Sequence, residues 1–126
     1  MKLYLLIAVA GAAGAVSRHA VNVWVAAWLG RGFPWGTLTV NLIGSALMGF
    51  LSVWLAARWQ WPLEYRVAVL TGFLGSFTTM SAFAVDTLAL FERQNWLWLF
   101  FYVLVTVVGA IIFLRAGMLL AERLTG

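Results

Sequence analysis

Long uncharged stretches separated by short charged ones make up most of the chain. Residues 32–57, 67–85 and 94–114 contain no Asp, Glu, Lys or Arg, and residues 3–29 form a further apolar stretch. A helix needs roughly 20 residues to cross about 30 Å of hydrocarbon, and each stretch is close to or above that length. The pattern predicts an all-α membrane protein with a single four-helix domain over residues 1–126. The transmembrane helices are expected at about residues 3–29, 34–57, 65–91 and 95–122.

The first apolar stretch has two interpretations. In the first, it is one transmembrane helix with three polar residues near its middle, Arg18, His19 and Asn22. Alternatively, Met1–Ala20 is a secretory signal peptide, since Lys2 precedes an apolar run that ends in small residues. Cleavage would leave three spans and remove Arg18. We favour the four-helix interpretation.

Tryptophans mark the ends of the expected spans. Seven of the eight lie there, and indole rings prefer the headgroup layer, which supports four spans independently of hydropathy. One side of the membrane carries four basic loop and terminal residues and the other carries two. This weak bias favours both termini in the cytoplasm of a multi-pass inner-membrane protein, and it also suits insertion in both directions. The tryptophans are Trp28, Trp35, Trp54, Trp59, Trp61, Trp96 and Trp98; the basic residues are Lys2, Arg58, Arg66 and Arg123, against Arg31 and Arg93.

The composition excludes a water-soluble globule. Hydrophobic residues make up 64% of the chain and charged residues 10%, with a mean hydropathy of +0.98, whereas soluble domains are nearer half apolar and a quarter charged. No cysteine, one histidine and four acidic residues leave little material for a metal cage or an acid–base pair, so we expect no enzyme. The net charge of +4 indicates topology and lipid-headgroup contact rather than nucleic-acid binding.

The third expected span has an unusual centre. Residues Thr71–Ser81 contain two glycines and five hydroxyl side chains. Hydroxyls are tolerated in a membrane helix when they bond back to their own backbone, which is one interpretation. Glycine beside a Ser/Thr run is also how a helix is interrupted within a membrane, leaving carbonyls and amides to face an ion or water. We expect a broken third helix.

Polar groups within the spans indicate an anion. Arg18 is costly in a membrane and is usually retained for pairing or function. Asn41 offers amide donors and several residues offer hydroxyls, which can replace the water around a small anion. Small residues at helical spacing, such as Gly14 on the first helix and Gly49 on the second, favour a dimer, although packing within one chain explains any single motif equally well. The hydroxyl residues are Thr79, Ser81, Tyr102 and Thr106.

Two motifs carry a family resemblance. Residues Gly36–Gly44 read GTLTVNLIG, and residues Gly72–Phe83 read GFLGSFTTMSAF. In combination they resemble the Fluc (CrcB) fluoride channel family, and the similarity covers the whole chain. The resemblance implies an antiparallel, dual-topology homodimer with two fluoride pores and a structural sodium ion at its centre. Such a protein would lower fluoride toxicity by passive efflux of cytoplasmic fluoride.

The resemblance also implies roles for individual residues. Gly75 and Thr78 match the positions whose backbone carbonyls hold sodium, and Arg18 matches the first-helix arginine. Asn41 matches the pore asparagine and Phe83 the second phenylalanine of the pore. The implied fluoride pore comprises Asn41, Met80, Ser81, Phe83, Tyr102 and Thr106.

Several positions depart from the family pattern. Met80 stands where the pore has its first phenylalanine, and a thioether has no positive ring edge to offer an anion. These departures leave an alternative open: a non-conducting member, or a subunit that needs a different homologue as its partner. A secondary transporter is a weaker option, since few titratable residues lie within the spans. The other departures are Ala82 and Ala84 for hydroxyl residues, Asp86 for a glutamate, and Ala110 and Leu114 for hydroxyl residues of the fourth helix.

Overall fold

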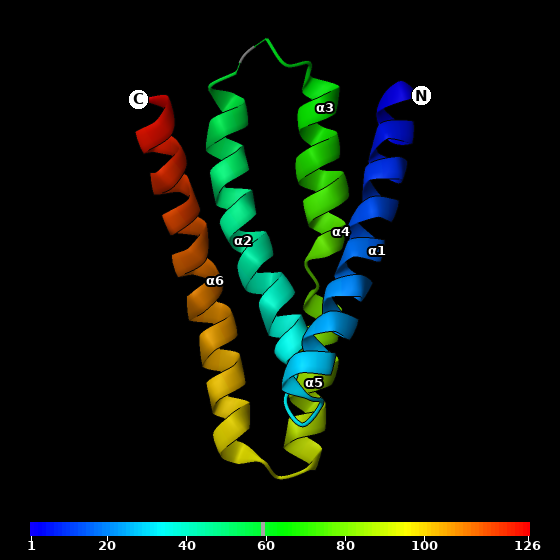
Figure 1. The fold of residues 1–126 in the computed structure, drawn as a ribbon, viewed down its shortest axis with the longest axis vertical. Coiled ribbons are helices and arrows are strands. Elements are labelled where there is room, and N and C mark those ends of the chain that lie inside the picture. Colours follow the sequence, from blue (N-terminus) through cyan, green and yellow to red (C-terminus); the bar gives the residue numbers. More distant parts are fainter. Residues whose placement is uncertain (59) are drawn as a thin grey trace.

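The computed structural model describes every residue except Trp59, so that tryptophan's predicted place at a span end lies outside the described residues. Four segments are helical, long and apolar enough to cross a membrane, which confirms the prediction of an all-α, four-span protein. Both termini lie at one end of the molecule, and the α1–α2 and α5–α6 connections lie at the other (Figure 1). The four segments are α1 (Lys2–Leu29), α2 (Trp35–Ala56), a third span over Leu63–Glu92, and α6 (Trp96–Thr125).

The third span consists of several pieces. It begins with α3 (Leu63–Val67), continues through the π-helical stretch η1 (Ala68–Leu74) and the short α4 (Gly75–Phe77), and ends with α5 (Met80–Glu92). Two non-helical residues separate α4 from α5. A π-helical stretch widens the helix and is often found at functional positions.

Local backbone chemistry sets the helix ends. α1 ends where Gly30 adopts a φ of 80°, a left-handed conformation that glycine reaches without steric cost. Pro34 and Pro62 stand directly before α2 and α3, where a residue without an N–H group loses no helical hydrogen bond. The observed bounds lie within three residues of the expected ones. The largest difference is in α6, which continues to Thr125 and carries an exposed Arg115–Glu122 ion pair at 3.1 Å in its last turns.

Glycines bring α2 and α6 close together. A Cβ atom on Gly49 would overlap the backbone carbonyl of Leu114, and one on Gly117 would overlap the carbonyl of Ala46. Small residues allow membrane helices to approach backbone to backbone, where dispersion forces act over a long seam. Gly49 therefore serves packing within one chain, so its spacing lends no separate support to a dimer.

We expect Gly49→Ala to destabilise this seam by about 1–3 kcal/mol, because an added methyl group forces the two backbones apart. Thermal unfolding in detergent micelles, followed by circular dichroism, measures the effect. Gly32→Ala is the matched control, since a Cβ atom there meets no described atom within 4 Å. Equal melting of the two variants would contradict the close α2–α6 contact.

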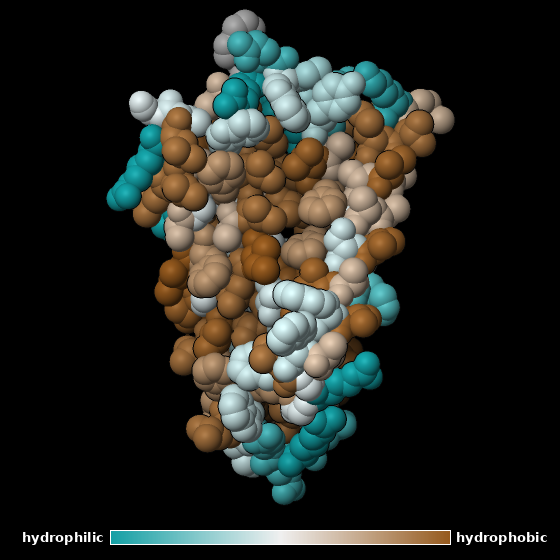
Figure 2. Space-filling view, in the orientation of Figure 1, coloured by the Kyte–Doolittle hydropathy of each residue, from teal (hydrophilic) through white to brown (hydrophobic). Residues whose placement is uncertain are grey.

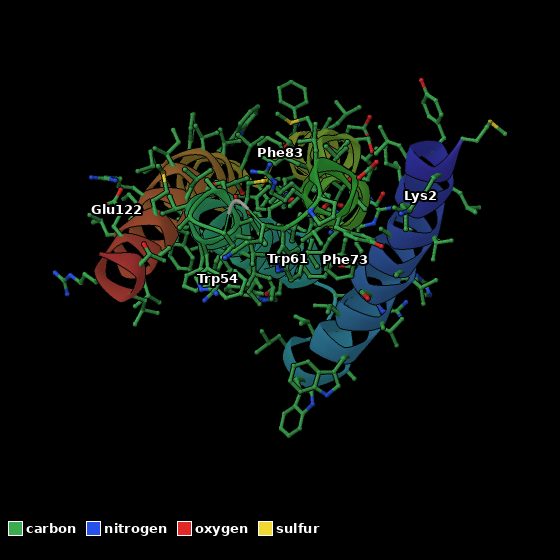
Figure 3. All side chains as sticks on the ribbon, turned by 90° about the horizontal axis from the view of Figure 1, so that it is seen from above. Lys2, Trp54, Trp61, Phe73, Phe83 and Glu122 are labelled. Atoms are coloured by element: carbon green, nitrogen blue, oxygen red, sulfur yellow. The ribbon has the colours of Figure 1, made fainter. Side chains whose placement is uncertain are left out.

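α1 packs against the first half of the third span and is splayed away from α6 (Figure 3). A Cβ atom on Gly14 would overlap the carbonyl of Phe73, and one on Gly72 would come within 3.0 Å of Ala10 Cβ. Gly14, like Gly49, is thus used within the chain. Much of α1 remains exposed, with Gly14 and Val25 its buried residues.

The face of the molecule seen in Figure 2 is mostly apolar over its middle and hydrophilic at both ends. Many of the large apolar side chains on α1, α5 and α6 are more than 40% exposed, as expected for residues that face lipid. The buried interior is small, and its largest fully buried side chains are Tyr102, Leu55, Leu74, Leu90 and Val40.

Candidate functional site

The backbone leaves helical geometry at Thr78 and Thr79. Thr78 has φ −82° and ψ 158°, and Thr79 has φ −151° and ψ 115°, so both residues are extended. Thr79 is the N-cap of α5, and its Oγ1 accepts a hydrogen bond from the N–H of Ala82 at 3.1 Å. Threonine is a favoured N-cap because its oxygen satisfies one of the free amides of the first turn.

Asn41 of α2 holds this extended segment from the side. Its Nδ2 donates to the Thr79 carbonyl at 3.1 Å, and its Oδ1 accepts from the Thr79 N–H at 2.8 Å. Both residues are buried. The two hydrogen bonds satisfy the N–H and the carbonyl of Thr79 outside a helix, which a membrane interior requires.

The end of α4 leaves backbone carbonyls without their usual partners. In a continuous helix the N–H of Thr79 would bond to the carbonyl of Gly75, but here it bonds to Asn41. Likewise, the N–H of Ala82 would bond to the carbonyl of Thr78, but here it bonds to the Thr79 hydroxyl. The predicted sodium positions, Gly75 and Thr78, are thus two carbonyl oxygens released from helical bonding. Hard cations take oxygen ligands of this kind, so these residues fit such an ion.

A cavity of about 330 Å³ opens beside the interruption, between α2, α5 and α6. Its lining brings together four of the six residues predicted for the pore and includes no carboxylate. Thr106 stands out among them, because its Oγ1 is buried without a hydrogen-bond partner among the described residues. The cavity is lined by Asn41, Ser45, Thr78, Thr79, Met80, Phe83, Thr106, Val107, Ala110 and Ile111.

The other two predicted pore residues lie outside this lining. Ser81 is exposed, with its Oγ 3.3 Å from Thr79 Oγ1. Tyr102 is fully buried next to the cavity: its ring centroid lies 5.2 Å from that of Phe83, and its hydroxyl donates to Asp86 Oδ2 at 3.1 Å. The view from above labels Phe83, and its contact with Tyr102 joins α5 to α6 (Figure 3).

The aromatic surroundings of Tyr102 were not predicted from the sequence. Phe33, in the connection before α2, packs edge-on to the Tyr102 ring at 5.4 Å and 4.5 Å from the Trp35 ring. The sequence contained a sign that Asp86 lies near the site, since Asp86 follows Phe83 by three residues and therefore shares its side of α5. Its pairing with Tyr102 depends on the packing of two helices.

Arg18 does not join the cavity. It is half-buried on α1, and the structure gives it no hydrogen bond or ion pair within the described ranges 1–58 and 60–126. Its neighbours His19 and Asn22 line a separate hollow nearer the end of the molecule.

The positions that depart from the family pattern fall in different surroundings. Met80 lines the cavity while 75% exposed, and Ala110 lines it without a hydroxyl. Ala84 is exposed. Leu114 lies away from the cavity and packs its carbonyl against Gly49.

The sequence is similar to known membrane proteins over nearly its whole length. Residues 5–118 match the family described as CrcB-like protein, Camphor Resistance (CrcB). A protein of Methylococcus capsulatus named "Fluoride-specific ion channel FluC" is 50% identical over 118 residues, which cover 94% of this chain and 52% of that protein. The chain therefore spans about half the length of that relative.

Two further relatives match from end to end. The "Fluoride-specific ion channel FluC" of Agrobacterium fabrum is 43% identical over 119 residues, covering 94% of this chain and 95% of the relative. The "Fluoride-specific ion channel FluC 2" of Nitrobacter hamburgensis is 43% identical over 122 residues, covering 97% of this chain and 98% of the relative.

Proposed function

The chain belongs to the CrcB family, and we propose on that premise that it is a fluoride-specific ion channel of the inner membrane. It gives cytoplasmic fluoride a passive way out, and it is a multi-pass transport protein rather than an enzyme. The names of relatives 43–50% identical over at least 94% of the chain support this function.

The unpaired hydroxyl of Thr106 is the observation that carries the proposal. Leaving a buried hydroxyl without a partner costs roughly 1–3 kcal/mol, so this unpaired donor on a residue of the cavity lining indicates a ligand that accepts hydrogen bonds. Fluoride is small and strongly hydrated, and a pore must replace its water with protein donors. Phe83 adds a ring whose edge is weakly positive, and the lining offers no carboxylate to repel an anion.

The pathway follows one face of each helix. Asn41 on α2, Phe83 on α5 and Thr106 on α6 line the same cavity. The Asp86 carboxylate lies outside that lining and accepts the Tyr102 hydroxyl. We infer that fluoride passes through this cavity, with Asn41, Phe83 and Thr106 in contact with it.

We propose that two antiparallel copies form the working channel. One chain leaves its cavity open on the side of Met80, Val107 and Ile111, which are 75%, 48% and 66% exposed. Lipid cannot line an ion path because it offers no donors, so a second protein surface is needed there. The exposed Ser81 and Gly75 lie on the same segment, which supports a contact between copies at this level.

We propose further that the released carbonyls of Gly75 and Thr78 hold a structural sodium ion at the centre of that dimer. The ion would supply positive charge to oxygens that otherwise lack a partner. The helix interruption would then be stabilised on both sides. Asn41 bonds to Thr79 on one side, and the ion would bind the end of α4 on the other.

A partner-dependent subunit is the second candidate function. Met80 and Ala110 favour it, because both line the cavity and neither offers a hydroxyl or an aromatic edge. A different homologue could supply these groups from the facing side of a heterodimer.

Fluoride efflux from liposomes that contain only this purified chain tests the proposal. With valinomycin as a potassium shunt, we expect rapid loss of fluoride and little loss of chloride in a parallel trial. Absence of fluoride loss from monodisperse protein would overturn the self-sufficient channel. Recovery of efflux on adding a homologous chain would then identify the partner-dependent subunit.

A further inference from the structure

An open groove lies between α2 and α6, in the half of the molecule that carries the termini. Its volume is about 390 Å³, every side chain in its lining is apolar, and it shares no residue with the central cavity. Leu47, Phe113 and Leu120 border it and are 39%, 42% and 53% exposed. The groove is therefore a lipid-facing hollow and not part of the packed interior.

The α2 wall of this groove continues into a stack of side chains that ends in a cation. Phe50 lines the groove, and its ring lies 6.4 Å from that of Trp54, nearly parallel at 19°. The guanidinium carbon of Arg58 lies 3.9 Å from the Trp54 ring centroid. Stacking on a ring leaves the N–H groups at the edge of a guanidinium free to donate. The wall thus changes from apolar to cationic toward the end of the molecule.

The α6 wall changes in the same direction. Leu120 lines the groove, and Arg123 follows it by three residues, so the two share one face of α6. Arg123 is exposed and forms no ion pair or hydrogen bond with any residue that the structure describes. Glu122 beside it pairs with Arg115 at 3.1 Å instead. A second unpaired guanidinium therefore stands beyond the groove.

The two arginines lie at about the same level. A Cβ atom on Gly117 would come within 2.9 Å of the Phe50 nitrogen, so these two residues lie side by side. Because α2 and α6 run in the same direction (Figure 1), Arg123 is level with Ala56, six residues beyond each of them. Arg58 follows Ala56 by two residues. One anionic group at this level can meet both guanidinium groups.

The dimensions match one leaflet of a bilayer. From Ile112 at the inner end of the groove to Arg123 the helix rises about 16 Å, and half of a hydrocarbon core is about 15 Å. The groove offers no donor or acceptor side chain to a polar guest, whereas guanidinium groups bind phosphate in charge-assisted hydrogen bonds. An occupant must therefore be apolar along one leaflet and anionic at its surface.

The geometry points to a binding site for one anionic glycerophospholipid, with an acyl chain in the α2–α6 groove and its phosphate between Arg58 and Arg123. Trp54 lies beside the phosphate at the headgroup level, where indole rings are favoured. In the view from above, Trp54 and Phe83 lie on opposite sides of α2 (Figure 3). The groove is thus turned away from the central cavity and from the contact between copies proposed above, which leaves it to lipid. This site does not depend on fluoride conduction.

Native mass spectrometry of the detergent-solubilised protein, titrated with dioleoyl phosphatidylglycerol or with dioleoyl phosphatidylcholine, tests the proposal. We expect one phosphatidylglycerol per chain, bound roughly tenfold more tightly than phosphatidylcholine because two basic residues attract its charge. Phosphatidylglycerol should also raise the melting temperature, since a ligand of the folded state alone stabilises it.

Two variants separate the headgroup from the acyl chain. Arg58→Gln/Arg123→Gln should reduce the preference for phosphatidylglycerol to within about twofold, and Arg58→Lys/Arg123→Lys should keep most of it. Ala116→Phe places a ring in the groove and leaves both arginines in place. It should weaken the binding of both lipids roughly tenfold, because contacts with the acyl chain are lost.

Lys2→Gln/Arg66→Gln is the matched control. It removes two cations from the same end of the chain, on α1 and α3, and neither residue lines the groove. We expect phosphatidylglycerol binding within about twofold of wild type. An equal loss in this control, or lipid binding that never saturates at one per chain, overturns the site.

Two further outcomes identify a different occupant and also overturn the proposal. Inorganic phosphate that raises the melting temperature as much as phosphatidylglycerol indicates an anion site without an acyl chain. Conversion of dimers to monomers by Ala116→Phe, with lipid binding unchanged, assigns the groove to a second copy of the chain. Because each readout is binding or melting, loss of fluoride conduction in wild type would leave the lipid site standing.

Discussion

Asn41→Asp is expected to lower fluoride efflux by a factor of about 100 or more, because it places a carboxylate where we propose that fluoride contacts the protein. Each factor of ten corresponds to about 1.4 kcal/mol, and two like charges some 4 Å apart repel by about 4 kcal/mol even at an effective dielectric constant of 20. Aspartate also loses the Nδ2 donor that bonds the Thr79 carbonyl at 3.1 Å, so two oxygens would face one another there. The liposome efflux assay measures the change.

Ser45→Ala is the matched control for this variant. Ser45 lines the same cavity one turn along α2, and no hydrogen bond of its side chain is found among the described residues. We expect it to retain efflux within a few-fold of wild type. If Asn41→Asp stayed monodisperse and conducted as well as Ser45→Ala, the path would not run past Asn41. Asn41→Ser, which keeps a neutral donor, should fall between the two.

The number and position of the spans could be predicted from the sequence because charge is excluded from hydrocarbon. Three uncharged stretches of 19 to 26 residues, together with the apolar stretch 3–29, leave few ways to place four helices. Glycine beside a run of Ser and Thr pointed to the stretch that contains the two extended residues Thr78 and Thr79. It could not say which donor would hold them, because Asn41 lies 38 residues away and reaches Thr79 through helix packing.

The use of small residues was harder to predict. Gly14 and Gly49 have the spacing of a contact between helices, and that spacing is the same whether the partner helix belongs to the same chain or to a second copy. The structure places the carbonyls of Phe73 and Leu114 against them. The exposed face on which we propose that a second copy binds contains instead Met80, Ser81 and the apolar side of α6.

For the candidate site, the sequence indicated which residues lie near one another better than it indicated which side chains they contact. Asn41, Met80, Phe83 and Thr106 line one cavity, as a shared pore requires. The place of Ser81 in the pore and the structural or electrostatic role of Arg18 stay predictions. The Tyr102–Asp86 hydrogen bond and the Phe33 ring beside it arise where three segments meet, and no local pattern encodes such a meeting.

Thr106→Val is expected to separate function from stability. Valine has the shape of threonine without its hydroxyl, so the variant removes the donor that we place next to fluoride and leaves the packing intact. We expect efflux to fall by roughly 10- to 100-fold, the effect of losing about 1.4–2.8 kcal/mol of interaction with the ion. The thermal stability of the folded protein should stay the same or rise, because the buried Oγ1 has no partner among the described residues to lose.

Thr39→Val is the control that makes this result informative. The Thr39 hydroxyl donates to the Trp35 carbonyl of its own helix at 2.7 Å and does not line the cavity. Its removal should change efflux by less than about threefold and cost a few tenths of a kcal/mol to 1 kcal/mol in stability. A structural role for Thr106 would reverse the pattern, with stability falling and efflux following it in proportion. A fall in efflux with no loss of stability requires that the Thr106 hydroxyl act on the permeating ion, since the ion is then the partner that the protein alone does not provide.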